Sequence, residues 1–117
     1  MPADKARDVL NVSEIGRRSA ENFGTFYVNN ANVASAFYDL SIMFSEIQSG
    51  PGEAVVLDKC RVTMSPAHAK ALALALAENI RRWEAQFGEI RLPEGMVTTG
   101  PNVGGAKASK KDIDRAR

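Results

Sequence analysis

Polar and apolar residues alternate along two segments of the chain, 36–45 and 54–64. In the first segment one face carries Ala36, Tyr38, Leu40, Ile42 and Phe44. In the second, two sets alternate, Cys60, Val62 and Met64 on one face and Lys59, Arg61 and Thr63 on the other. A period of two predicts strands that each bury one face. The second segment begins with an apolar run, 55–57, which predicts either a bulge or a contact beyond the sheet.

A shorter strand is predicted over residues 24–30, where Phe26 and Val28 alternate with more polar neighbours. Three asparagines, Asn29, Asn30 and Asn32, stand between this strand and the next. Asparagine favours turns because it tolerates the left-handed region and its side chain caps nearby backbone groups. Turn formation is the main interpretation, but a turn does not require three, so a polar cluster at an interface between subunits and a ligand site stay open as alternatives. A second turn is predicted over residues 49–53, which contain proline and glycine.

The periodicity changes to a helical one after Met64. Ser65 is a suitable N-cap and Pro66 suits the first helical position. An apolar stripe follows at spacings of three and four: Ala69, Leu72, Ala73, Leu76, Ile80, Trp83 and Phe87. Gly88 is a suitable helix terminator, and Leu74 lies off the stripe. The fold class predicted is α+β, a three-stranded antiparallel meander followed by one long amphipathic helix that lies across it.

Composition divides the chain into three parts. Residues 1–21 are charged with little periodicity, which predicts a mobile segment with room for a short helix. Residues 93–117 are rich in glycine, proline, serine, threonine and lysine, which predicts a disordered tail. The folded domain is expected over residues 22–92.

A domain of this size predicts self-association. About 70 ordered residues without a disulfide or a metal form a core worth only ~3–5 kcal/mol. One helix covers one face of a sheet, and the other face is expected to show Phe37, Met43, Val55 and Leu57. Such a face is too apolar for water. We therefore expect a homodimer or a dimer of dimers, completed through a sheet face or a sheet edge.

Charge and composition argue against several functional classes. The net charge of +1 argues against nucleic-acid binding, which needs a concentrated basic surface. No apolar run approaches the roughly 18–20 residues that cross a bilayer, and the first residues lack the apolar centre of a signal peptide, so the cytoplasm is expected. The single cysteine, Cys60, excludes an internal disulfide and a cysteine-based zinc cluster. We find no catalytic constellation and predict a non-enzymatic protein without cofactor or metal.

Individual reactive residues have ordinary structural explanations. His68 is an isolated histidine in the first turn of the helix, which is a poor metal site. Cys60 belongs to the predicted core face, where a thiol packs as a small hydrophobic side chain. The glycines of the tail lack the lysine that a phosphate-binding loop requires. Asp39 and Asp58 could meet across neighbouring strands, but polar residues also suit a solvated sheet face. The candidate interface or polar-cluster residues are Asn29, Asn30, Asn32, Phe37, Asp39, Met43, Val55, Leu57 and Leu74.

The order "YVNNANV", "FYDLSIMF" and "VTMSPAHAKALALALAENIRRWEAQFGEI" resembles an uncharacterised bacterial family, the domain-of-unknown-function family numbered three-four-six-seven. The shared features are an aromatic-x-Asn turn, an aspartate early in the second strand, Ser-Pro before the helix and an aromatic-Glu-x-x-Phe-Gly end. The resemblance covers about residues 22–92 and implies the same fold in a cytoplasmic bacterial protein, with no activity to carry over. The topology is also similar to that of the export chaperone SecB.

Three functions remain open at this point. The leading one is a homo-oligomeric module that binds another protein or peptide through the apolar residues left over on sheet and helix. The second is a SecB-like holder of unfolded clients. The third is a small-molecule binder or small enzyme that uses Asp39, the Asn29–Asn32 segment and Arg61, and it needs a concave site where these side chains converge.

Overall fold

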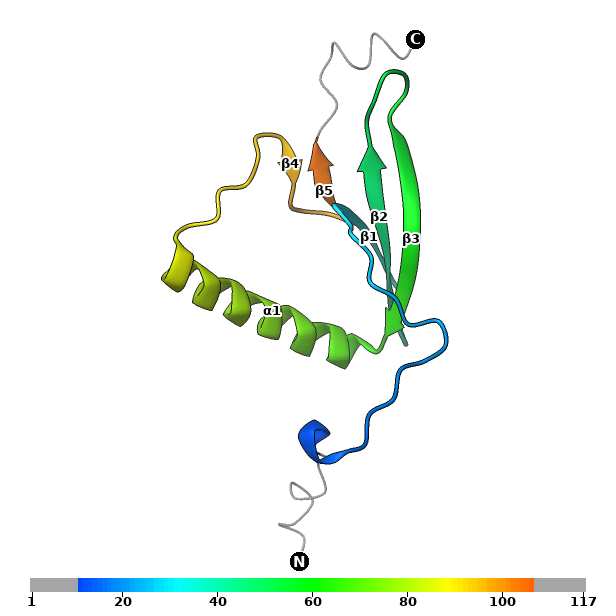
Figure 1. The fold of residues 1–117 in the computed structure, drawn as a ribbon, viewed down its shortest axis with the longest axis vertical. Coiled ribbons are helices and arrows are strands. Elements are labelled where there is room, and N and C mark those ends of the chain that lie inside the picture. Colours follow the sequence, from blue (N-terminus) through cyan, green and yellow to red (C-terminus); the bar gives the residue numbers. More distant parts are fainter. Residues whose placement is uncertain (1–10, 107–117) are drawn as a thin grey trace, which may run out of the picture.

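The computed structural model describes residues 11–106, which form one antiparallel sheet, one long helix and one short 3-10 helix. The elements in chain order are η2 (Val12–Glu14), β1 (Asn30–Ser35), β2 (Leu40–Gln48), β3 (Val55–Met64), α1 (Pro66–Phe87), β4 (Met96–Val97) and β5 (Asn102–Ala106). The five strands lie in the order β3-β2-β1-β5-β4 (Figure 1). The α+β class is confirmed, with five strands in place of the predicted three.

The β2–β3 hairpin confirms the alternation of the two long strands. Leu40 pairs with Met64, Ile42 with Val62 and Phe44 with Cys60. Residues paired across antiparallel strands point to the same face of the sheet. The registers of β1, β2, β3 and β5 thus gather one set of residues on what we call the apolar face: Ala31, Val33, Leu40, Ile42, Phe44, Val55, Leu57, Cys60, Val62, Met64 and Val103, with Ser35, Glu46 and Gln48 at its margins.

A bulge interrupts the β2–β3 pairing. Phe44 pairs with Cys60 but Ser45 pairs with Asp58, so Lys59 is left without a partner in the ladder. Its ammonium lies 3.4 Å from Glu46 Oε1, and both side chains are 24% exposed. The apolar run 55–57 predicted a bulge or an outside contact, and the bulge lies two residues beyond the end of this run.

The predicted position of the first turn is wrong. Asn30 and Asn32 lie within β1, and residues 24–28 are not in a strand. The chain reverses instead at Phe37 and Tyr38, where Ala36 N donates to Asp39 O at 2.9 Å. Aromatic residues favour strands, so the pattern at 36–38 was typical of a continuing strand. The asparagines were typical of a turn, but here they pair with neighbouring strands.

The prediction of a disordered tail is wrong for two segments, because β4 and β5 belong to the sheet. Strand pairing uses backbone groups, which a glycine-rich segment also has. Gly104 has φ 104°, and a Cβ there would collide with the carbonyl oxygen of Asn29. Glycine is therefore required for the close approach of β5 to β1. The rest of the predicted tail, residues 107–117, lies outside the described residues, as do residues 1–10 of the predicted N-terminal segment.

The helix begins and ends at the predicted residues. Ser65 Oγ accepts a hydrogen bond from His68 N at 3.1 Å, Pro66 occupies the first turn, and Gly88 ends the helix with φ 106°. The predicted packing of this helix across the sheet is wrong. α1 leaves the end of β3 and runs away from the sheet, with which it makes no extensive contact (Figure 1). A single residue, Ser65, separates the end of β3 from the start of α1.

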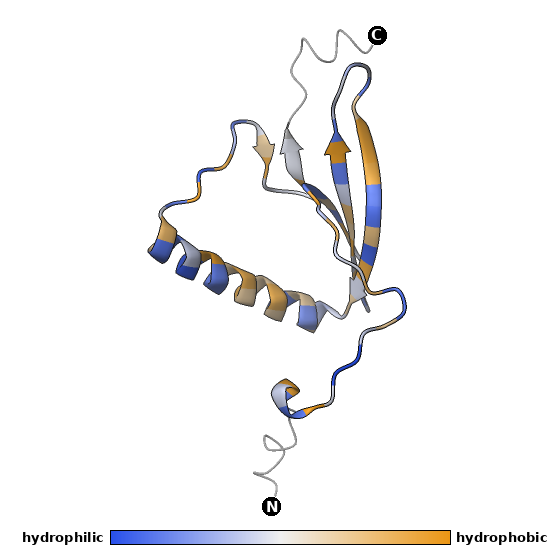
Figure 2. Cartoon of the chain, viewed as in Figure 1, coloured by the Kyte–Doolittle hydropathy of each residue, from blue (hydrophilic) through white to orange (hydrophobic). Residues whose placement is uncertain are grey.

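The apolar stripe of α1 is consequently exposed. Figure 2 shows hydrophobic residues following the helix along its length, with hydrophilic residues between them. The large members of the stripe are all exposed in the single chain: Leu72, Leu76, Ile80, Trp83 and Phe87. Within residues 11–105, no hydrophobic side chain is buried. One copy of the chain therefore has two apolar surfaces, the apolar face and the stripe, and neither covers the other.

Candidate functional site

The second face of the sheet is mainly polar. The register places on it Asn30, Asn32, Ser41, Met43, Ser45, Asp58, Arg61, Thr63 and Asn102, and also Ala34, Ile47 and Val56. We call this the polar face. Adjacent polar side chains bond across the strands here, as Ser41 Oγ and Thr63 Oγ1 do at 2.9 Å. The prediction that the second face is apolar, with Phe37, Met43, Val55 and Leu57 together, is therefore wrong.

Asn29 extends the β1–β2 ladder with its side chain. Its Nδ2 donates to Ile47 O at 3.3 Å, and Ile47 N donates to its Oδ1 at 2.7 Å. The amide group thus pairs with β2 as a peptide group would. The backbone of Asn29 joins both neighbours as well, because its N–H donates to Ser45 O and its carbonyl accepts from Gly105 N. Asn29 fixes the point where β2 and β5 meet β1.

Asn32 forms a cross-strand pair with Asn102 of β5. Asn32 Nδ2 donates to Asn102 Oδ1 at 2.6 Å, and the two residues are register partners. Sequence reasoning had no ground for choosing Asn102, since it stands in a segment with the composition of a disordered tail. The surplus asparagines therefore build the junction of β1 with β2 and β5. They do this within one chain.

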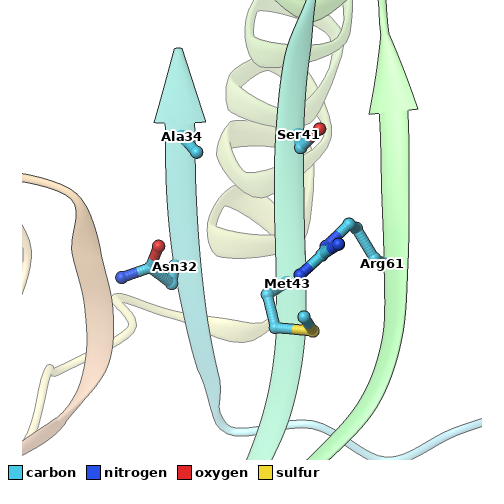
Figure 3. A pocket seen from close by; sticks show the side chains of 5 residues that line it. All are labelled: Asn32, Ala34, Ser41, Met43 and Arg61. Carbon is cyan, nitrogen blue, oxygen red and sulfur yellow. The ribbon is translucent and has the colours of Figure 1, made fainter.

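A shallow hollow of about 250 Å³ lies on the polar face, lined by Asn32, Ala34, Ser41, Met43 and Arg61. Figure 3 shows Arg61 reaching from β3 across β2 toward Met43, while Asn32 stands at the opposite wall. The guanidinium of Arg61 can hold a carboxylate because it donates several N–H groups, whereas the Asn32 amide is turned toward β5, where its Nδ2 donates to Asn102. Asp39 lies outside this hollow, at the turn that precedes β2. Of the predicted small-molecule site, only Asn32 and Arg61 line this hollow, while Asp39, Asn29 and Asn30 do not.

Ser45 is the residue that sequence reasoning missed. It is 2% exposed, and its Oγ donates to Asp58 Oδ1 at 2.7 Å beside the bulge. Asp58 therefore meets Ser45 and not Asp39, which is near the other end of β2. The carboxylate pair considered as an acid–base site does not form.

The remaining candidates are dispersed. Phe37 projects from the β1–β2 turn with 86% of its surface exposed, and its ring meets that of Tyr38 edge-on at 4.9 Å. Val55 and Leu57 lie on β3 beyond the bulge, both exposed. Leu74 is exposed on α1. The structure thus brings the three asparagines and Met43 together on neighbouring strands. The remaining candidates lie elsewhere: Phe37, Asp39, Val55, Leu57 and Leu74.

Most of the chain matches a known protein family. The sequence profile of a family described as "Protein of unknown function (DUF3467)" matches residues 3–92. The chain belongs to the DUF3467 family. The DUF3467 match covers β1, β2, β3 and α1 and stops before β4 and β5. The resemblance found in the sequence is confirmed, and the match begins earlier than the residue 22 expected.

Comparisons with curated proteins and with solved structures return no match. The similarity to SecB therefore has no support beyond the order of elements. Among residues 11–106, no helix has both the length and the apolar character needed to cross a membrane.

Proposed function

We propose that this DUF3467 protein is a non-enzymatic, homo-oligomeric module that binds another protein or peptide, with the homodimer as its basic unit. One observation carries the proposal, namely that residues 11–105 bury no hydrophobic side chain within a single chain. A stable domain buries most of the apolar surface that its secondary structure creates. The exposed stripe and the apolar face are such surfaces, and a second copy supplies identical ones.

The energy at stake supports association. Burying an aliphatic or aromatic side chain completely contributes roughly 1.5–3 kcal/mol. The five large residues of the stripe are each about half exposed, so covering them contributes about 5 kcal/mol per chain. This is comparable with the whole stability of a small domain. A monomer whose stripe stays in water lacks that stabilisation.

Sedimentation velocity across micromolar concentrations tests the oligomer. We expect a dimer that dissociates only on dilution, with loss of helical circular dichroism on dissociation, because the separated chains lack a core. A folded monomer at every concentration would contradict the proposal.

The turn at Phe37 and Tyr38 supports the second part of the proposal, binding to another protein. The two rings are among the most exposed large hydrophobic side chains of the described residues, at 86% and 84%. They contact each other and lie outside both apolar surfaces, so a dimer formed through those surfaces leaves them available. Exposed aromatic residues frequently anchor protein interfaces.

The test compares the wild type with a Phe37→Ser, Tyr38→Ser double variant in affinity capture from native lysate. We expect a partner retained by the wild type and lost with the variant, while the dimer is unchanged in sedimentation. Identical sets of captured proteins would contradict binding through this turn.

A second candidate function rests on the hollow beside Arg61. The Arg61 guanidinium in an open hollow with mixed polar and apolar walls suits a small carboxylate or a peptide carboxyl terminus. Nuclear magnetic resonance titration with acetate and with short peptides tests it. Chemical-shift changes at Asn32 and Ser41 that disappear in Arg61→Gln would support this function, and unchanged shifts would exclude it.

A further inference from the structure

We infer that the two chains of the homodimer exchange their helices, so that the stripe of each α1 packs on the apolar face of the partner's sheet. This inference rests on the proposed homodimer and specifies its interface. The occupant of the apolar face is thus a second copy of this chain.

The connection between β3 and α1 prevents the helix from covering its own sheet. Connections from a strand to a packed helix usually have two to six residues. Here only Ser65 lies between Met64 and Pro66, and Ser65 is itself extended, with φ −68° and ψ 153°. Its side chain caps the helix, and the proline fixes the first turn. The backbone therefore has no free residue in which to turn α1 back over the sheet.

The two surfaces match in chemistry. The stripe contains only alanine, leucine, isoleucine, tryptophan and phenylalanine. The Glu78 ion pairs with Arg81 and Arg82 lie on the opposite side of α1. On the sheet, the register places one charged residue on the apolar face, Glu46 opposite Leu57, and its carboxylate pairs with Lys59 of the bulge. The charge on the apolar face is therefore already paired within its own chain before a helix packs there.

Only helix-on-sheet contact covers both apolar surfaces in one dimer. If the two helices paired with each other, both apolar faces would stay in water. If the two sheets stacked, both stripes would stay in water. In Figure 3 the labelled side chains of the polar face point toward the viewer and α1 lies behind the sheet, on the side of the apolar face. A two-fold axis on that side places each helix over the partner's apolar face.

The area is sufficient for a stable dimer. Five half-exposed large side chains present about 500 Å² on each stripe. Covering them on an equal area of sheet, twice by symmetry, buries about 2,000 Å² in total, which is the lower end for obligate dimers. The length of α1 also fits, since 22 residues span about 33 Å and five strands span roughly 19 Å.

Cysteine pairing between chains tests the contact directly. Cys60 lies on the apolar face, and the 117-residue sequence contains no other cysteine. We would co-express the wild type with a larger, tagged chain that carries Cys60→Ser and Leu76→Cys, oxidise the purified mixture and separate it on a non-reducing gel. Since each chain then has one cysteine, a mixed disulfide can form only between chains.

We expect a strong mixed band from Leu76→Cys, and also from Ile80→Cys, the next large residue of the stripe. The control is Ala85→Cys, nine positions after Leu76 and hence on the opposite side of the helix. It is expected to give less than a tenth of that band. Equal bands from all three variants, or none from either stripe variant, would overturn the exchange.

Lengthening the connection gives an independent test. Inserting Gly-Ser-Gly-Ser between Met64 and Ser65 keeps the cap and frees the helix to fold onto its own sheet. Short hinges favour exchange between copies, and longer ones relieve it. We expect sedimentation to change from dimer to compact monomer with helical content retained.

If the lengthened chain stays dimeric, with an unchanged dissociation constant, the helices are not exchanged, although the proposed homodimer stands. If the wild type itself is a folded monomer, the proposed homodimer fails. The two failures are therefore distinguished by which chain is monomeric.

Discussion

Two leucines of the same helix give the sharpest test of the interface. Leu76 lies on the stripe and is 58% exposed in the single chain, while Leu74 lies off the stripe and is 66% exposed. Leu76→Ser and Leu74→Ser make the same chemical change in the same helix. They have the same cost in helix propensity, so a difference between them reports the environment of the side chain in the dimer.

The size of the effect follows from the exposure. Complete burial of a leucine contributes up to about 3 kcal/mol, so covering the exposed part of Leu76 contributes roughly 1.5 kcal/mol. A symmetric dimer contains the contact twice, which makes about 3 kcal/mol. That corresponds to a roughly 100-fold increase in the dissociation constant. Leu74→Ser is expected to change it less than about threefold, as surface substitutions do.

Sedimentation velocity over a dilution series measures both dissociation constants. A dissociation constant for Leu76→Ser within threefold of that for Leu74→Ser would refute the stripe as the interface. A stronger effect at Leu74 would place the contact on the other side of the helix.

Three further predictions concern the fold, measured by urea unfolding at one fixed protein concentration. Asn29→Ala should lower the free energy of unfolding by about 1–2 kcal/mol, because two hydrogen bonds to β2 are lost. The control Asn30→Ala should lower it clearly less. Equal losses in the two variants would contradict the role of the Asn29 amide. Gly104→Ala should lower the free energy of unfolding by at least about 2 kcal/mol more than Gly100→Ala does. Both glycines have positive φ, but of the two only Gly104 lies against a neighbouring backbone. Similar losses in the two variants would show that β5 does not pack against β1 there. Ser65→Ala should cost about 1 kcal/mol and Ser65→Asp close to none, and an equal loss in both would contradict the cap.

Much of the local structure could be predicted from the sequence. The period of two placed Leu40, Ile42 and Phe44 on one face, and the register confirms it. Ser65, Pro66 and Gly88 marked the ends of α1 because capping depends on neighbouring residues alone. Such local rules act over a few positions, and the sequence shows them directly.

Features that depend on distant partners could not be predicted. Asn32 is a good turn residue until a strand with Asn102 lies beside it, and nothing near Asn32 in the sequence indicates that strand. Gly104 and Gly105 indicate disorder by composition, although they allow the close contact with β1. The prediction that α1 packs on its own sheet was wrong for a similar reason. The stripe predicts that the helix is covered, but it does not say by which chain.

The strand order also dictates when the sheet can form. Asn32 and Asn102 are neighbours in the sheet but 70 positions apart in the chain, whereas the β2–β3 hairpin is local. During synthesis the hairpin can form early, but β1 keeps an open edge until β5 has emerged, and open edges invite pairing with other chains. A fragment that stops at residue 92, where the DUF3467 match ends, would retain that open edge permanently. We therefore expect a chain that extends through Ala106, fourteen residues past the family boundary, to be needed to cover this edge of β1.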